Sequence, residues 1–281
     1  MTAGVFAMVL CAAVLHAAWN AMIKVSGDRV VVLAVMMAAQ AVFALAALAF
    51  VPVPPWSVWP FILFSTVFHT GYFLLLTAAY RVGDLSHVYP VSRGVAPLVV
   101  AAGAALAAGE TLGPQATIAL MLIVAGIASV AVARGKPVLE DRLALIYALG
   151  TGLCIAGYTL VDGLGAREAG GAASYILWLN LFNGLPIIAL ALALRRGAQR
   201  RLDGSAWRMG ALSGVVSLAA YWIVLWAMTQ APLALVSAVR ESSIVFALLF
   251  GVFFLKERLD LRKTVSIFLT VAGTALLKIS R

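Results

Sequence analysis

The sequence predicts an all-helical integral membrane protein with ten transmembrane helices. Of its 281 residues, 64% are apolar and only 11% are charged, whereas soluble domains carry about 25% charged residues. The apolar residues form runs close to the roughly 20 residues that a helical span needs. These runs lack the alternation of apolar and polar residues found in outer-membrane strands. The composition argues against a soluble enzyme, a disordered chain and a nucleic-acid-binding protein.

Ten apolar runs follow one another along the chain, and turn residues or charges separate them. They cover residues 3–23, 30–51, 60–80, 86–108, 114–133, 143–165, 172–194, 207–229, 233–255 and 262–279. Pro60, Pro114 and Pro232 stand where a helix would begin, a position that proline tolerates. Cys11 and Cys154 lie inside apolar runs without metal-ligand spacing. We therefore expect neither a metal nor another cofactor.

Basic residues gather on one side of the predicted bundle. Fifteen of the 20 Lys and Arg residues belong to the odd-numbered connections between runs, and three belong to the opposite side. The remaining two, Arg93 and Arg240, fall inside runs. The positive-inside rule then places the odd connections in the cytoplasm and both termini outside. We expect a monomer in a bacterial inner membrane, with the lipid bilayer and a small-molecule substrate as partners and no nucleic acid.

The chain contains an internal repeat. A shift of 147 residues aligns Arg93 with Arg240 and Glu110 with Glu257, and it aligns the strings Val-Ala-Gly-Ile-Ala and Val-Ala-Gly-Thr-Ala. We interpret residues 1–135 and 136–281 as two copies of a five-helix unit. Because five is odd, the second copy enters the membrane from the opposite side. Inverted repeats of this kind are typical of secondary transporters.

Several segments resemble the drug/metabolite transporter superfamily, and within it the ten-helix EamA-type exporters. They are His16-Ala-Ala-Trp19-Asn20-Ala-Met-Ile-Lys24, the stretch from Pro97 to Glu110-Thr-Leu, the repeated Val-Ala-Gly-x-Ala, and Lys256-Glu257-Arg258-Leu259. The resemblance covers the whole chain and is closest to the YddG-type aromatic amino-acid exporters. It implies two inverted five-helix repeats around a central cavity, with the fifth and tenth helices at the periphery. The family's proline in the second copy is missing, because position 244 is Ile.

Polar side chains inside membrane spans are costly, so each is a candidate for function. His16, Trp19 and Asn20 share one helical face, where they line a cavity or bond a neighbouring helix. Trp222 is a weaker candidate, because aromatic stripes more often pack. The candidate substrate-binding residues are His16, Trp19, Asn20, His69, Tyr72, Tyr89, Ser92, Arg93, Tyr158, Asp162, Tyr221, Trp222, Arg240 and Glu241.

The charged candidates allow more than one reading. Arg93 is permanently charged and needs an anion or a watery cavity, and an internal salt bridge with Asp162 or Glu241 is the alternative. Arg240 and Glu241 are adjacent, and because neighbours on a helix point about 100° apart we expect them to reach different partners. Asp162 lies within about a turn of the predicted helix end, from which it can reach water.

These residues favour a secondary transporter that exports small amphipathic metabolites, namely amino acids with bulky apolar or aromatic side chains. Arg240, with Arg93, would hold a carboxylate, and Glu241 or Asp162 an ammonium group. The aromatic residues Trp19, Tyr158 and Trp222 would contact the apolar ring.

Other functions remain as alternatives. Antiport of organic phosphates or nucleotide sugars is less favoured, because phosphate calls for several converging cations. Export of cationic drugs is a further option, since intramembrane acids and aromatics accept cations. We expect no enzyme, since His-Glu-x-x-His and Gly-x-Ser-x-Gly motifs are missing. Proton coupling through His16, His69, Asp162 or Glu241 and facilitated diffusion are both compatible with the sequence.

Overall fold

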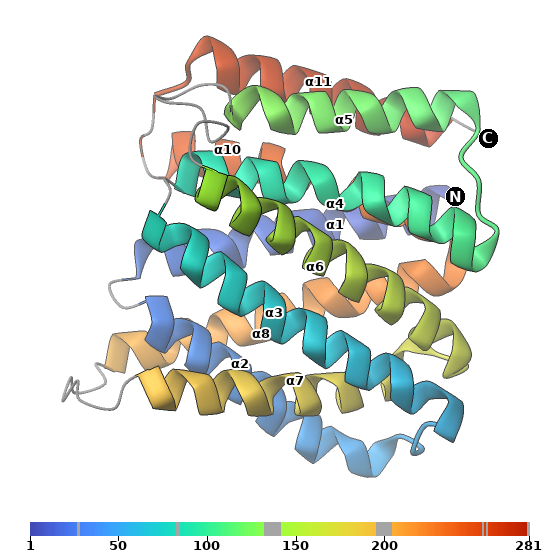
Figure 1. Ribbon diagram of the computed structural model, residues 1–281, viewed down its shortest axis with the longest axis vertical. Coiled ribbons are helices and arrows are strands. Elements are labelled where there is room, and N and C mark those ends of the chain that lie inside the picture. Colours follow the sequence, from blue (N-terminus) through green and yellow to red (C-terminus); the bar gives the residue numbers. More distant parts are fainter. Residues whose placement is uncertain are drawn as a thin grey trace.

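The computed structural model in Figure 1 describes most of the chain. The described residues are 1–26, 29–82, 85–131, 142–194, 204–254, 256 and 258–279. Only the backbone is described for residues 29, 30, 80–82, 85–89, 131, 190–192 and 194. The predicted boundary between the two copies, at residues 135 and 136, lies outside the described residues, and so does Glu257.

Every regular element in the described part of the chain is a helix, which confirms the predicted all-helical class. Most helices match one predicted apolar run each. Their bounds are α1 (Ala3–Val25), α2 (Arg29–Ala47), η1 (Leu48–Phe50), η2 (Trp56–Val58), α3 (Trp59–Val82), α4 (Leu85–Ala108), α5 (Pro114–Ala131), α6 (Arg142–Glu168), α7 (Ala172–Leu194), α8 (Gly204–Gln230), α9 (Leu233–Arg240), α10 (Ser243–Phe253) and α11 (Leu261–Ile279).

Eight helical segments among the described residues are long and apolar enough to cross a membrane, with Leu233–Phe253 counted as one segment. Helix α5 is apolar too, but only over the shorter stretch Pro114–Val130. Helix α11 carries three basic residues, Arg262, Lys263 and Lys278, within its 19 residues and is not among the eight. A multi-pass membrane protein is thereby supported, while the predicted number of ten spans stays a prediction.

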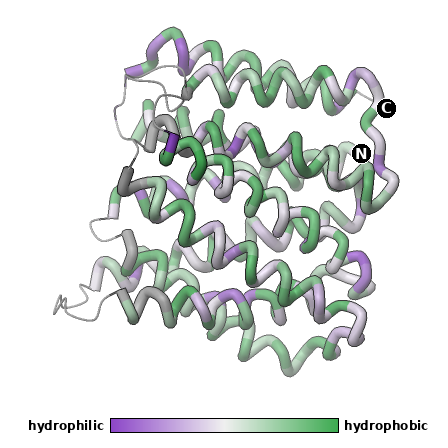
Figure 2. The backbone as a smooth tube through the Cα atoms, viewed as in Figure 1, coloured by the Kyte–Doolittle hydropathy of each residue, from purple (hydrophilic) through white to green (hydrophobic). Residues whose placement is uncertain are grey.

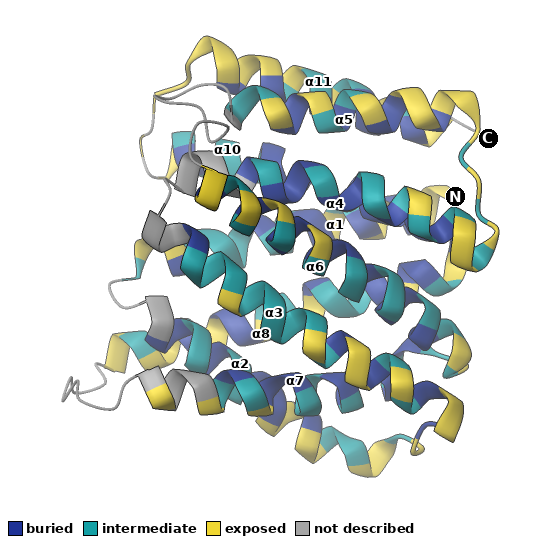
Figure 3. Cartoon of the chain, in the orientation of Figure 1, coloured by how far each residue is buried: buried dark blue, intermediate teal, exposed yellow. Residues whose placement is uncertain are grey.

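The helices lie side by side in a bundle, and both chain termini lie at the same end, on the right of Figure 1. Helix α5 packs along α11 at one edge, α3 and α4 pack on α6, and α1 and α2 pack on α8. Hydrophobic residues run along the helices (Figure 2). Many are exposed on the outer faces (Figure 3), including Phe43 and Leu106. In a membrane, lipid covers such surfaces.

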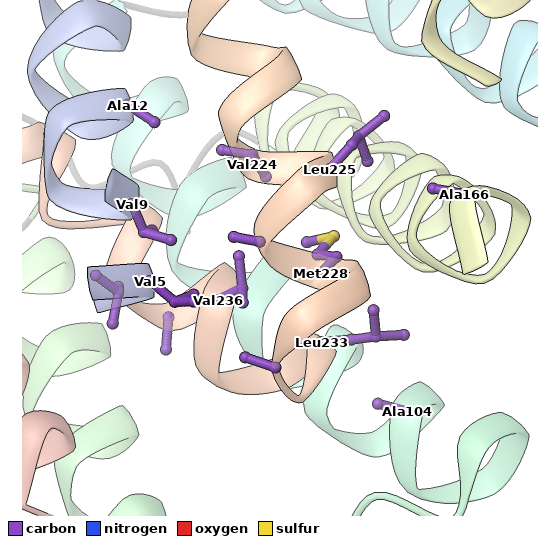
Figure 4. Packing of buried hydrophobic residues seen from close by; sticks show 14 of the residues in the cluster. Val5, Val9, Ala12, Ala104, Ala166, Val224, Leu225, Met228, Leu233 and Val236 are labelled. Atoms are coloured by element: carbon purple, nitrogen blue, oxygen red, sulfur yellow. The ribbon is translucent and has the colours of Figure 1, made fainter. Parts of the chain in front are cut away.

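The largest apolar core extends over most of the helices, and Figure 4 shows its part among α1, α4, α6, α8 and α9. Val9, Leu225, Met228 and Leu233 are almost completely buried in it. Helix α6 comes close because Gly163 has no side chain, and a Cβ there would lie 2.5 Å from Leu233 Cδ2. This packed layer closes the space between these helices near the end at which α8 is followed by α9.

The ninth predicted run is broken in the middle, between α9 and α10. Around the break the backbone forms tighter bonds between residues three apart, from Ser242 N to Val239 O at 3.0 Å and from Ile244 N to Glu241 O at 3.1 Å. Helix α4, in contrast, is continuous through Pro90 and Pro97. The two repeat-equivalent runs therefore differ. The first has Pro97 and stays continuous, whereas the second has Ile244 at the equivalent position and is broken.

Candidate functional site

Three charged side chains meet in the interior beside the break, and we call them the charged triad: Arg93, Arg240 and Glu241. Arg93 Nε lies 3.0 Å from Glu241 Oε2, and Arg93 Nη2 donates to Ser243 Oγ at 3.0 Å. Glu241 is 1% exposed. The salt bridge considered for Arg93 is therefore formed with Glu241 and not with Asp162. The triad holds two cations and one anion, so one positive charge is in excess.

Arg240 is the less satisfied of the two arginines. Its Nη2 atom lies 3.5 Å from Glu241 Oε1 and 3.3 Å from Thr159 Oγ1, both long contacts. Its Nε atom is buried and has no hydrogen-bond partner among the described residues. The expectation that Arg240 and Glu241 reach wholly different neighbours was wrong. Because the helix breaks at Glu241, the two side chains come closer than they would on a regular helix.

Asp162 is fully buried, which corrects the expectation that its carboxylate reaches water. Helix α6 continues to Glu168, so Asp162 lies well inside it. Tyr175 donates to Oδ1 at 2.8 Å, and Tyr221 donates to Oδ2. Within the described part of the chain, no basic side chain forms an ion pair with Asp162. The carboxylate is thus held by neutral hydroxyl groups alone.

Aromatic rings surround this acid. His69 stacks on Tyr158 with ring centroids 4.1 Å apart, and it meets the ring of Tyr221 edge-on at 6.1 Å. Tyr72 in turn meets Tyr158 edge-on at 6.2 Å. Ser65 Oγ lies 3.1 Å from His69 Nδ1 and fixes one side of that ring. Four predicted site residues from α3, α6 and α8 therefore form one aromatic wall.

The acid and the charged triad are neighbours because both touch the same face of α6. Thr159, which accepts from Arg240, is three residues before Asp162, and Tyr158 is four residues before it. Residues at these spacings share a helix face, with Cβ atoms about 5–6 Å apart. Within the described residues, Arg240 has a donor without a partner and Asp162 has no cationic partner. The position on α6 that Arg240 contacts thus lies about one helical turn from Asp162.

The three polar residues of α1 satisfy each other to a large extent. Trp19 Nε1 donates to His16 Nδ1 at 3.3 Å, and Asn20 Nδ2 donates to the His16 carbonyl at 2.7 Å. All three are partly exposed. His16 lies within electrostatic reach of both Arg93 and Arg240. The structure therefore brings these three residues of α1 to the charged triad, and both of the hydrogen bonds described above lie within α1.

The remaining predicted residues have different positions. Ser92 is buried where α4 meets α6, and a Cβ on Gly152 would lie 2.8 Å from its carbonyl oxygen. Trp222 packs against the main apolar core. The side chain of Tyr89 lies outside the described residues. In the part of the chain that is described, no three His, Cys, Asp or Glu side chains gather as a possible metal site.

Sequence reasoning missed Tyr175 and Thr159, although both contact charged groups of the site. It also missed the ion pair of Arg167 and Glu110, whose Nη1 and Oε1 atoms lie 2.7 Å apart. Many apolar runs contain a tyrosine or threonine, and the sequence does not show which of them face a charged group. Glu110 was noticed only as a repeat position, and Arg167 only as a charge outside the predicted spans.

Comparisons with known proteins support a transporter. The chain resembles a crystal structure of a protein with a TM-score of 0.80 and 17% sequence identity, over 99% of each chain. That likeness shows a shared fold. No curated protein matches the chain. The model of the EamA-like transporter family matches residues 142–279, which suggests a membrane transporter of the drug/metabolite type. Residues 142–279, just under half of the chain, are therefore similar to the EamA-like transporter family.

Proposed function

We propose that the protein is a secondary transporter of the bacterial inner membrane that exports amino acids with bulky apolar or aromatic side chains. Export proceeds by alternating access, as residues 1–135 and 136–281, two inverted five-helix halves, rock around a shared site. The family match over residues 142–279 supports transport. The proposed exporter is of the YddG type, since the aromatic wall suits an aromatic substrate.

The packing of the helices supports two related halves. Helix α3 packs on α6, and α8 packs on α1. These are equivalent pairs when each helix of one half is matched with its counterpart in the other half. Likewise α2 packs on α7 and α5 packs on α11, each with its own counterpart. A pseudo-twofold axis in the plane of the membrane would generate this pattern.

The proposed substrate class depends on two charged side chains beside the same face of α6. They are Asp162, which belongs to α6, and Arg240, which belongs to α9 and contacts Thr159 of α6. Arg240 has only long contacts and a buried Nε without a partner. Asp162 accepts two hydroxyl bonds and forms no ion pair within the described residues. A free α-amino acid carries a carboxylate and an ammonium group on one carbon. Its two charges therefore match Arg240 and Asp162.

Of the two acids considered for the ammonium group, Asp162 fits better than Glu241. Glu241 is already engaged by Arg93 at 3.0 Å and Arg240 at 3.5 Å. Taking it as the ammonium acceptor would leave two buried arginines without their anion, which is costly. Glu241 instead fixes Arg93, and its longer contact leaves Arg240 able to turn toward a carboxylate.

The side chain of the substrate would lie against the aromatic wall. Tyr158 and Tyr221 flank Asp162, and Tyr72 extends the wall away from it. Rings placed edge-on or offset to these residues gain about 0.5–1.5 kcal/mol beyond their buried area. Trp19 supplies a further ring on the α1 face, whereas Trp222, packed in the apolar core, is assigned no contact.

Counterflow in proteoliposomes tests this proposal. Vesicles loaded with unlabelled phenylalanine should transiently accumulate labelled phenylalanine, tryptophan or methionine. They should not accumulate 2-phenylethylamine, which lacks the carboxylate, or 3-phenylpropionate, which lacks the ammonium group. Arg240→Gln and Asp162→Asn should each lower phenylalanine counterflow at least about tenfold, the loss of one charge-assisted contact. The exposed Arg208 provides the matched control, Arg208→Gln.

Three outcomes would contradict the proposal. Counterflow of a sugar phosphate without any amino-acid signal would favour an antiporter of organic phosphates. Counterflow of 2-phenylethylamine without phenylalanine would favour an exporter of cationic drugs. Undiminished phenylalanine counterflow by Arg240→Gln would exclude Arg240 as the carboxylate anchor.

A further inference from the structure

Two partly exposed side chains tie together four chain segments at one end of the bundle. Arg167 lies at the end of α6, and its Nη1 atom is 2.7 Å from Glu110 Oε1. Its Nε donates to the Met228 carbonyl at 2.7 Å, and its Nη2 donates to the Ala231 carbonyl at 2.9 Å. The other oxygen of Glu110 accepts from Leu233 N at 2.7 Å. We call Glu110 and Arg167 the clasp.

The clasp satisfies helix ends that would otherwise have unpaired groups. The last carbonyls of a helix and the first N–H groups of the next have no intrahelical partners. Arg167 binds the carbonyls at the end of α8, and Glu110 binds the first N–H of α9, where a negative charge is favoured. The turn between α8 and α9 is thus held by two side chains that belong to other segments.

The backbone places Glu110 for this contact. Gly109 has a φ of +66°, a conformation that glycine adopts without strain. It turns the chain back at the end of α4, and Glu110 N donates to the Ala104 carbonyl at 3.1 Å. The carboxylate is therefore anchored to the last turns of α4 on one side and reaches α6 and α9 on the other.

An apolar layer lies next to the clasp, because Met228 and Leu233, whose backbone atoms the clasp binds, both belong to it (Figure 4). Their side chains point into the core with Val9, Leu225 and Ala166. These five residues are between 0% and 1% exposed. The Arg167 and Glu110 side chains are 30% and 18% exposed. Water therefore reaches the ion pair but not the layer next to it.

We infer that the clasp is the latch that holds this end of the transporter shut, and that its opening is a step of each transport cycle. The inference rests on the alternating access proposed above. Because Glu110 belongs to residues 1–135 whereas Arg167 and Leu233 belong to residues 136–281, rocking of the two halves breaks the ion pair and the contact of Glu110 with Leu233 N together. Because the pair is partly in water, this separation is less costly than breaking a buried pair. The adjacent apolar layer seals the path only while the latch is closed.

Accessibility of a single cysteine in the apolar layer tests the latch without any substrate. In a chain whose own cysteines are replaced, Cys11→Ala and Cys154→Ala, the variant Val9→Cys places one thiol in the sealed layer. A membrane-impermeant thiol reagent applied at the clasp end should label it slowly. Arg167→Gln should raise the labelling rate by about tenfold or more, since charge-assisted bonds are lost. Glu110→Gln, which keeps the shape and an oxygen acceptor, should raise it too.

The matched control is Lys278→Gln, which removes a charge near Phe6 on α1 but no clasp contact. It should label as slowly as the parent. Thermal midpoints of all variants establish that they are folded. Equal labelling rates of the parent, Arg167→Gln and Glu110→Gln would overturn the latch. Because no substrate is used, that result would leave the amino-acid proposal standing, and a failed counterflow experiment would leave the latch standing.

Discussion

Among single residues, Glu241 stands out because one buried carboxylate compensates the charges of two buried arginines. It is 1% exposed and forms ion pairs with both buried arginines, Arg93 and Arg240. Removing one partner of a buried ion pair leaves the other charge without compensation, which costs more than the pair contributes. The stability of the interior therefore depends on this carboxylate more than on either arginine.

The variant Glu241→Gln should lower the free energy of unfolding by about 3–5 kcal/mol, because both arginines lose their counter-charge. Arg240→Gln should cost clearly less, since the contacts of Arg240 are long. Thermal midpoints in detergent would measure both changes. A Glu241→Gln protein as stable as the parent would show that the triad is not held by this charge.

The sequence identified most of the charged residues of the candidate site but not their partners. Arg93, Arg240, Glu241 and Asp162 stand out because charges are rare in apolar runs. Which acid pairs with which arginine depends on how α4, α6 and α9 meet, and no single-chain pattern encodes that. Tyr175 was missed for the same reason, since it becomes visible only when α7 covers Asp162.

Between elements, α5 and α11 form a closely packed seam. A Cβ on Gly126 would lie 2.5 Å from Thr270 Oγ1 and 3.0 Å from the Ser266 carbonyl. On the other side of the seam, a Cβ on Gly273 would lie 2.7 Å from the Ala119 carbonyl. Small residues let membrane helices approach closely and gain van der Waals contacts. These two glycines belong to the repeated Val-Ala-Gly-x-Ala strings, so the repeat has a packing role.

Gly126→Ala should lower the free energy of unfolding by about 1–3 kcal/mol, because the added methyl group forces the two backbones apart. Gly4→Ala is the matched control, since a Cβ there meets nothing within 4 Å. It should leave the thermal midpoint unchanged or slightly higher. If both variants melted alike, close approach at the seam would contribute nothing to stability.

The apolar runs predicted the helix positions well, but they did not predict which helices are continuous and which are broken. Prolines are expected to interrupt helices, yet α4 stays continuous with Pro90 and Pro97 inside it. The ninth run breaks at Glu241 with no proline there. At this break, backbone hydrogen bonds between residues three apart tighten the turn in which Glu241 contacts both arginines.

At the scale of the whole molecule, charge and aromatic residues mark opposite ends. Exposed basic residues such as Arg142 and Arg208 begin α6 and α8 at one end. At the other end, Trp56 and Trp59 lie before and at the start of α3 with their rings 6.2 Å apart. Tryptophan favours the membrane interface, and Lys and Arg favour the cytoplasmic side. Because tryptophan is enriched at both interfaces, the basic residues alone predict the orientation, with the basic end inside.

Topology reporters fused to the chain should confirm this orientation. Alkaline phosphatase joined after Arg281 should be active, and green fluorescent protein at the same place should be dark, because the positive-inside rule predicts that both termini lie outside. The matched control is a fusion after Gln199, in the basic connection between α7 and α8, which should give the opposite readings. A fluorescent, phosphatase-inactive C-terminus would reverse the predicted orientation.

The charged triad also has a consequence for the proposed origin of this chain by duplication and fusion of a half-length gene. Under the proposed duplication, Gly94 occupies in the first half the position that Glu241 occupies in the second. A half-length ancestor that assembled as a symmetric homodimer carries every side chain twice, so it has an even number of acids at its axis. Fusion of the two genes frees each copy to mutate alone. One glutamate between two arginines is a set that a symmetric homodimer of one half-length chain cannot provide.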